Sequence, residues 1–168
     1  VCAIDLGGPE TACTIRSMKE LFEYATSNGV PFVMHAGEKE DYKGIDAALS
    51  FGAKRIGHGL SAIKHYDTME KLKKLDVPLD ICLTANIATG IFENYSDHPI
   101  ERLMDSGVAI TINTDNRTIN KTTLTDEYIL LNKHFGFTIK DFNEMNKMAI
   151  EHSFLSDKEK QELLKELV

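Results

Sequence analysis

Short apolar runs alternate with polar turns and amphipathic stretches along most of the chain. Five runs predict β-strands, at residues 1–6, 31–34, 55–57, 79–83 and 108–113, and a helical pattern follows each of them. The strands begin 24 to 30 residues apart, which is the spacing of strand–helix–strand units. Apolar strands connected in this way predict an α/β fold, with a parallel sheet covered by helices.

After the last strand the pattern becomes entirely helical. The three segments concerned are residues 122–135, 138–154 and 156–167. Ser156 and Glu159 have the spacing of a capping box for the last of these helices. Asp67 and Glu70 have an acidic variant of the same spacing, which predicts a helix that begins near residue 67.

Two architectures contain five such units. One is a complete doubly wound sheet, and the other is a partial (β/α)8 barrel, whose full form needs about 250 residues. A chain of 168 residues with 42% apolar and 27% charged residues is typical of a single globular domain. Because the strand pattern begins at residue 1, we expect the chain to be part of a longer protein.

Charge and cysteine content argue against several classes of function. The chain has 19 Lys and Arg against 26 Asp and Glu, a net charge of −7, so we expect no nucleic-acid polymer as a partner. No apolar run reaches the roughly 20 residues of a membrane span, so we expect no membrane partner either. Cys2, Cys13 and Cys82 form no paired motif, which favours reduced thiols and a cytoplasmic protein.

Each predicted strand is followed by polar or ionisable side chains, often beside glycine. They are Asp5, His35 with Glu38, His58, Asn86, and Asp115 with Asn116. The carboxyl ends of parallel strands form the active-site edge of α/β folds, and imidazole with carboxylate suits zinc and similar ions. The pattern predicts metal-assisted hydrolysis, in which Glu38 moves a proton. Taken alone, Asp115 could instead form an Asx turn, and His58 could simply close a turn between two glycines.

Five short motifs resemble those of the adenosine deaminase family, in the same order. They are IDLGGPE (4–10), FVMHAGE (32–38), RIGHG (55–59), ICLTAN (81–86) and TINTDN (111–116). The family counterparts are DLAG-E, HAGE, RIGHG, CPTSN and NTD, and Leu83 and Ala85 replace the Pro and Ser of the fourth. The resemblance extends over essentially the whole chain and implies a (β/α)8 barrel.

The resemblance also implies a zinc-dependent reaction. The 6-amino group of adenosine or deoxyadenosine would be removed by hydrolysis, which gives inosine or deoxyinosine and ammonia. His35 and Asp115 would bind zinc, Glu38 would pass a proton to purine N1, and His58 would orient the hydroxide held by the zinc. Asp115 would thus be both a ligand and part of the catalytic group.

Two further residues would contact the purine nucleoside. Gly8 would offer its backbone N–H to purine N3. Asn116 stands where many relatives have a second Asp facing N7, and a neutral amide donates to that acceptor directly.

The family's first strand has a His-x-His pair that supplies two more zinc ligands, and the sequence contains no such pair. The chain therefore corresponds to strands four to eight and the C-terminal helices, with two of the four protein ligands. We expect a missing N-terminal part, or another chain, to pair with its strand edges. We expect the chain alone to be inactive and to bind metal weakly.

Two alternatives stay open at this point. The protein could act on adenine or another aminopurine, because most ribose contacts would lie in the missing part. From a different class, it could be a complete, non-catalytic binding domain with a doubly wound sheet. That domain would cover both sheet edges with its own helices, whereas a partial barrel leaves strands 1–6 and 108–113 as open edges.

Overall fold

The computed structural model describes residues 1–8, 15–39 and 42–167. Within these residues one sheet is formed by β1 (Ile4–Leu6), β2 (Phe32–Ala36), β3 (Arg55–His58), β4 (Leu79–Ile81) and β5 (Ile110–Ile112). All neighbouring strands pair in parallel, in the spatial order β1-β2-β3-β4-β5. The predicted strands and their parallel pairing are therefore confirmed.

The strand order separates the two predicted architectures. A doubly wound sheet reverses direction at a switch point, whereas here every crossover adds the next strand on the same side. Sequential order is the arrangement of a (β/α)8 barrel, so the structure is a partial barrel. The doubly wound alternative is wrong, because no reversal of strand order occurs among the described strands.

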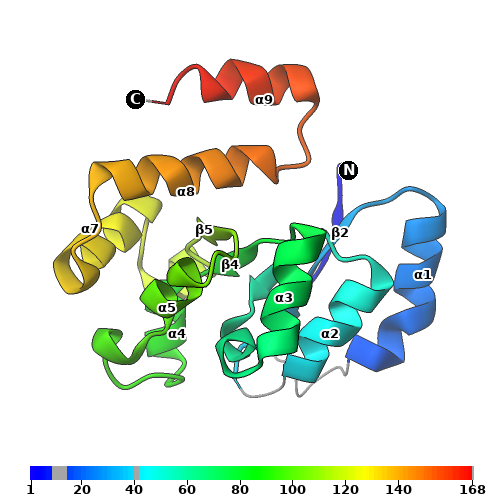
Figure 1. Ribbon diagram of the computed structural model, residues 1–168, viewed down its shortest axis with the longest axis horizontal. Helices are drawn as coiled ribbons and strands as arrows, with labels where there is room; N and C mark the ends of the chain where they lie inside the picture. Colours follow the sequence, from blue (N-terminus) through cyan, green and yellow to red (C-terminus); the bar gives the residue numbers. More distant parts are fainter. Residues whose placement is uncertain (9–14, 40–41, 168) are drawn as a thin grey trace.

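Helices connect and cover the strands (Figure 1). They are α1 (Lys19–Ser27), α2 (Tyr42–Phe51), α3 (Tyr66–Leu75), α4 (Leu83–Ala88), α5 (Ile100–Asp105), α6 (Arg117–Asn120), α7 (Leu124–Phe135), α8 (Ile139–Glu151) and α9 (Asp157–Leu164). Helices α1, α2 and α3 stand side by side, and α8 packs against β5. Within the described residues, none of these helices has both the length and the apolar character needed to cross a bilayer.

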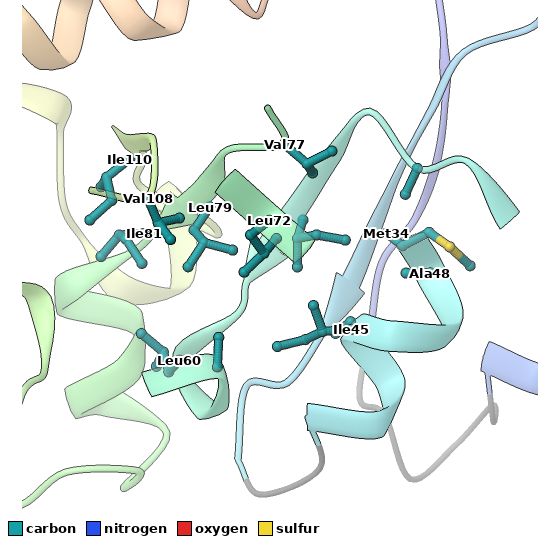
Figure 2. Close-up of a cluster of buried hydrophobic side chains, with 14 of the residues drawn as sticks. Met34, Ile45, Ala48, Leu60, Leu72, Val77, Leu79, Ile81, Val108 and Ile110 are labelled. Carbon is teal, nitrogen blue, oxygen red and sulfur yellow. The ribbon is translucent and has the colours of Figure 1, made fainter. Parts of the chain in front are cut away.

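Burial alternates along the central strands and divides the sheet into two faces. In β2, Phe32, Met34 and Ala36 are buried and point toward the helices, whereas Val33 and His35 lie on the other face. Figure 2 shows Met34 beside Ala48 of α2, with Leu72 of α3 in the same apolar layer. The second face is largely polar, and it includes the cross-strand neighbours His35, Gly57, Asp80 and Thr111.

Several predicted boundaries differ from the structure. The strand expected at residues 79–83 ends at Ile81, and Leu83 already begins α4. The Asp67–Glu70 cap is wrong, because α3 begins at Tyr66 and Asp67 lies inside its first turn. The capping box of Ser156 and Glu159 is confirmed by hydrogen bonds in both directions.

The two edge strands are β1 and β5, as expected for a partial barrel. Asp5 of β1 is exposed. Ile110–Ile112 of β5 are all buried, because α8 packs against this strand. The expectation of an open edge at residues 108–113 concerns backbone pairing and is confirmed, because among the described strands β5 pairs with β4 alone.

Candidate active site

A pocket of about 320 Å³ opens on the polar face, where the strands end. It is lined by Asp5, Val33, His35, Gly57, His58, Asp80, Cys82, Asn113, Thr114 and Asp115. These residues come from all five strands or from the positions directly after them. The structure therefore brings the predicted residues His35, His58 and Asp115 together at one edge.

Glu38 belongs to the same cluster. Its Oε1 atom lies 3.9 Å from Nε2 of His58. The imidazoles of His58 and His35 meet edge to face, with ring centroids 4.9 Å apart. The charges of His35 and Asp115 both act on the pKa values of Glu38 and His58, so the four side chains share one electrostatic environment.

Glycine at position 57 makes room for His35. The two residues are neighbours in the register of β2 and β3, on the same face. A Cβ atom on Gly57 would lie 2.6 Å from Cδ2 of His35, which is too close for any side chain. The absence of that atom lets the imidazole lie across β3 and reach the pocket.

Two of the strand-end residues have left-handed backbone conformations. The φ angles are 64° at His58 and 52° at Asp115. Non-glycine residues seldom adopt this region, and such strain is concentrated at functional sites. An Asx turn formed by Asp115 does not account for its positive φ angle. The side chain that accepts a backbone hydrogen bond here is that of Asn116, whose Oδ1 accepts from Ile119 N.

Burial shifts both titratable groups at the centre of the cluster. Burial raises the pKa of Glu38, an effect partly offset by the nearby His35 charge and reinforced by Asp115. Burial also lowers the pKa of His58 to about 4, so its imidazole is neutral near pH 7. The pair therefore combines a carboxyl group that retains a proton more readily than usual with a neutral imidazole.

A partly buried ion pair, which was not predicted from the sequence, lies beside the pocket. Arg55 donates from Nε and Nη2 to the two carboxylate oxygens of Asp80, at 3.0 and 2.6 Å. Thr111 Oγ1 donates to Asp80 at 2.6 Å and accepts from Asn113. The sequence did offer one indication of this pair. Asp80 lies within an apolar strand pattern, and a carboxylate removed from water requires a partner.

The second missed feature is a chain of buried polar groups behind His58. Nδ1 of His58 lies 3.2 Å from Nδ2 of Asn86, and Oδ1 of Asn86 lies 3.3 Å from Nε2 of His98. The exposed fractions of Asn86, His58 and His98 are 0%, 2% and 4%. Asn86 was expected at a strand end, but it lies within α4 and faces inward.

Burial of His98 gives a stability prediction. It lowers the pKa of this imidazole from 6.5 to about 4, so between these values the unfolded chain binds a proton that the folded chain does not. The free energy of unfolding should therefore fall as pH decreases from about 6.5 to 4, by up to roughly 3 kcal/mol. Urea unfolding at pH 7 and pH 5 should show this slope reduced in His98→Gln and retained in the exposed-site control His134→Gln.

The remaining predicted contacts lie outside the lining of the pocket. Gly8, with φ of 108°, and Asn116 are both exposed and do not line the pocket. Pro9 and Glu10 of the first motif, and Cys13, lie outside the described residues. Cys82 lines the pocket, and burial raises the pKa of its thiol.

The donors in this pocket form an incomplete metal site. His35 and Asp115 supply one imidazole and one carboxylate to the same pocket, which is a donor pair that suits zinc. Among residues 1–8, 15–39 and 42–167, no group of three or more His, Cys, Asp or Glu side chains is arranged to hold a metal. Further ligands would have to come from elsewhere.

Known proteins resemble the chain in both sequence and fold. The family model described as adenosine deaminase matches residues 1–168. An adenosine deaminase of Clostridium acetobutylicum is 37% identical over 168 residues, which cover 99% of this chain and 50% of the relative. The chain thus spans about half the length of the curated relatives it matches, and it corresponds to their C-terminal half.

Two solved structures have the same fold over this length. The crystal structure of an adenine deaminase from Arthrobacter aurescens has a TM-score of 0.94 and 26% identity, covering 99% of this chain and 51% of that one. The N6-methyl-AMP deaminase from Arabidopsis thaliana has a TM-score of 0.85 and 29% identity, covering 97% and 48%.

Proposed function

Since the chain belongs to the adenosine deaminase family, we propose that the whole protein removes the 6-amino group of adenosine or deoxyadenosine by hydrolysis. The products would be inosine or deoxyinosine and ammonia. This chain would supply the part of the site that carries the proton-transfer residues. The observation that supports the proposal most directly is the meeting of His35, His58 and Asp115 in one pocket, with Glu38 beside them.

Zinc fits the donors that this chain offers. His35 and Asp115 would hold it, with two further ligands from the part of the protein outside this chain. When bound, zinc supplies a water molecule whose pKa is lowered toward 7 and which can attack carbon at neutral pH. The orientation of His35 depends on the space left by Gly57.

This dependence predicts the effect of Gly57→Ala. The added methyl would displace the His35 ring, and a shift of about 1 Å at a catalytic group can reduce the rate about 100-fold. A suitable comparison is Gly7→Ala, whose Cβ would lie 3.7 Å from Nε2 of His35, an ordinary contact. Steady-state kinetics should show a clearly larger loss for Gly57→Ala, and equal rates in the two variants would contradict the assignment.

Glu38 would act as the proton donor. Its raised pKa keeps a proton available at higher pH than for an ordinary carboxyl group. Protonation of purine N1 withdraws electrons from C6 and makes that carbon more electrophilic. The hydroxyl proton of the attacking water would return through the same carboxylate to the departing amino group.

His58 would orient the attacking water. Burial keeps its imidazole neutral near pH 7, and Nε2 faces Glu38 across 3.9 Å. A neutral imidazole donating a hydrogen bond stabilises negative charge on oxygen as the C–O bond forms. Asp115 would contribute both as a metal ligand and as a nearby negative charge.

Asn116 is suited to recognise the purine. Its Oδ1 atom accepts from Ile119 N at 3.1 Å, which fixes the orientation of the amide. The Nδ2 group is then free to donate to the acceptor N7. The backbone N–H of Gly8, at the opposite edge of the sheet, would donate to N3.

The second candidate is an aminopurine deaminase with another preferred substrate. It is favoured by the TM-score of 0.94 with the Arthrobacter adenine deaminase. We expect ammonia release from adenosine by the whole zinc-loaded protein to have a higher kcat/KM than release from adenine. Faster turnover of adenine would exclude the nucleoside assignment, and release from neither would exclude both adenosine and adenine as substrates.

The remaining parts of the proposal concern partners and location. The small-molecule substrate fits a protein with net charge −7 better than a nucleic-acid polymer would. Cys2 and Cys82 are free thiols, which favours the cytoplasm. The outer edge of β1 would pair with the N-terminal part of the whole protein.

A further inference from the structure

The polar groups behind His58 come from three separate parts of the chain. His58 ends β3, Asn86 lies on α4, and His98 precedes α5. All three are almost completely buried. Water therefore has little access to them, and their hydrogen bonds to one another determine which ring nitrogens hold protons.

The Asn86 amide can determine the proton positions on both rings. Its nitrogen only donates and its oxygen only accepts. Since Nδ2 faces Nδ1 of His58 at 3.2 Å, that ring nitrogen must be an unprotonated acceptor. Since Oδ1 faces Nε2 of His98 at 3.3 Å, that nitrogen must be a donor. A neutral imidazole has a single N–H, so the proton of His58 is on Nε2.

Rotating the amide by 180° would reverse every assignment and is disfavoured. The proton of His98 would then lie on Nδ1, which is buried and has no hydrogen-bond partner among the described residues. An unpaired buried N–H is rarer in proteins than an unpaired acceptor.

We propose that Asn86 is a positioning residue that holds His58 as the Nε2–H tautomer, and that His98 in turn fixes the orientation of the Asn86 amide. His58 thus faces the pocket as a hydrogen-bond donor and not as a proton acceptor. The tautomer follows from the geometry alone. Its catalytic consequence rests on the proposed function, because a donor at Nε2 would orient the attacking water and stabilise charge on its oxygen.

Asparagine is required for this arrangement, because an isosteric carboxylate would move the proton of His58 from Nε2 to Nδ1. The carboxylate oxygen that Asn86→Asp places opposite His58 can only accept, so Nδ1 of His58 would gain a proton. His98 could still donate to the other oxygen. The variant therefore preserves the shape of the side chain and the hydrogen bond from His98. In the hydrogen bond with His58, donor and acceptor exchange places.

Two variants of His98 form a matched pair. In His98→Gln a side-chain amide can still donate to Oδ1 of Asn86, so the amide orientation should persist. In His98→Leu the Asn86 oxygen loses its donor, and both orientations of the amide become available. The tautomer of His58 should therefore be kept in the first variant and mixed in the second.

Long-range ¹H–¹⁵N spectra of the histidine rings test the tautomer in this chain at pH 7, with His58 assigned by its absence in His58→Gln. We expect a protonated Nε2 and an unprotonated Nδ1 in the wild type and in His98→Gln, and a protonated Nδ1 in Asn86→Asp. A protonated Nδ1 in the wild type would overturn the proposal. So would identical spectra of His58 in the wild type and His98→Leu.

Kinetics of the whole zinc-loaded protein test the consequence. We expect Asn86→Asp to lower kcat for adenosine by roughly 10- to 100-fold, as is typical of residues that orient a catalytic group, with KM changed much less. His98→Gln should retain most of kcat, and His98→Leu should not. An unchanged kcat in Asn86→Asp would overturn the positioning role. An inactive wild type with the expected ring spectra would instead refute the proposed function and leave the tautomer assignment supported.

Discussion

Glu38→Gln is expected to lower kcat for adenosine deamination by about 10²- to 10⁴-fold, which is the contribution of a positioned proton donor. The amide has nearly the shape of the carboxyl group, but it has no proton to transfer to the purine ring. Zinc content should stay the same, because Glu38 is not among the proposed ligands. Steady-state kinetics of the whole protein, with metal analysis of the same samples, would measure both effects.

Glu93→Gln provides the matched control, since Glu93 is an exposed carboxylate outside the pocket. It should leave kcat unchanged.

The pH profile gives a second criterion: because burial raises the pKa of Glu38, the acid form is present at low pH and is lost as pH rises through that raised pKa. We expect wild-type activity to decline as pH rises through this pKa. The activity of Glu38→Gln should show no such decline. Equal kcat in the wild type and Glu38→Gln would remove Glu38 from the mechanism.

His35→Ala is the second change with a large expected effect. Residues that hydrogen-bond to metal ligands contribute roughly 10- to 100-fold to metal affinity, so loss of a direct ligand should weaken zinc binding by more than this. Activity should disappear with the metal. Competition with a zinc chelator would measure the affinity. The control is His134→Ala, which removes an exposed imidazole on α7. Unchanged zinc affinity in His35→Ala would show that the imidazole is not a ligand.

The sequence predicted the sheet because its signals are local. Apolar runs with regular spacing identified five parallel strands, and all five are present. Polar residues at the strand ends identified His35, His58 and Asp115, which the fold brings into one pocket. The order of the strands was left open, because two architectures share the same spacing and differ only in long-range pairing.

Helix α4 was missed because distant contacts support it. Its six residues lack a side-chain cap from Cys82. Glu127, on α7 and completely buried, accepts instead from the backbone N–H of Thr84 at 3.0 Å. Such a carboxylate stabilises the first turn of a helix, but it lies 43 residues away in sequence. The inward direction of Asn86, and with it the partner of His58, follows from this helix.

The Arg55–Asp80 pair was missed for a similar reason. Asp80 stands alone within an apolar pattern and Arg55 is the first residue of β3, so only the pairing of β3 with β4 brings them together. Their side chains retain 13% and 15% exposure on the open face of the sheet.

The most direct test of the central claim is the metal position in crystals of the whole protein grown with zinc, located by anomalous scattering at the zinc edge. We predict one zinc ion with a His35 ring nitrogen and an Asp115 carboxylate oxygen both at about 2.0–2.2 Å. An intact fold in which the bound zinc lies out of reach of either side chain would contradict it.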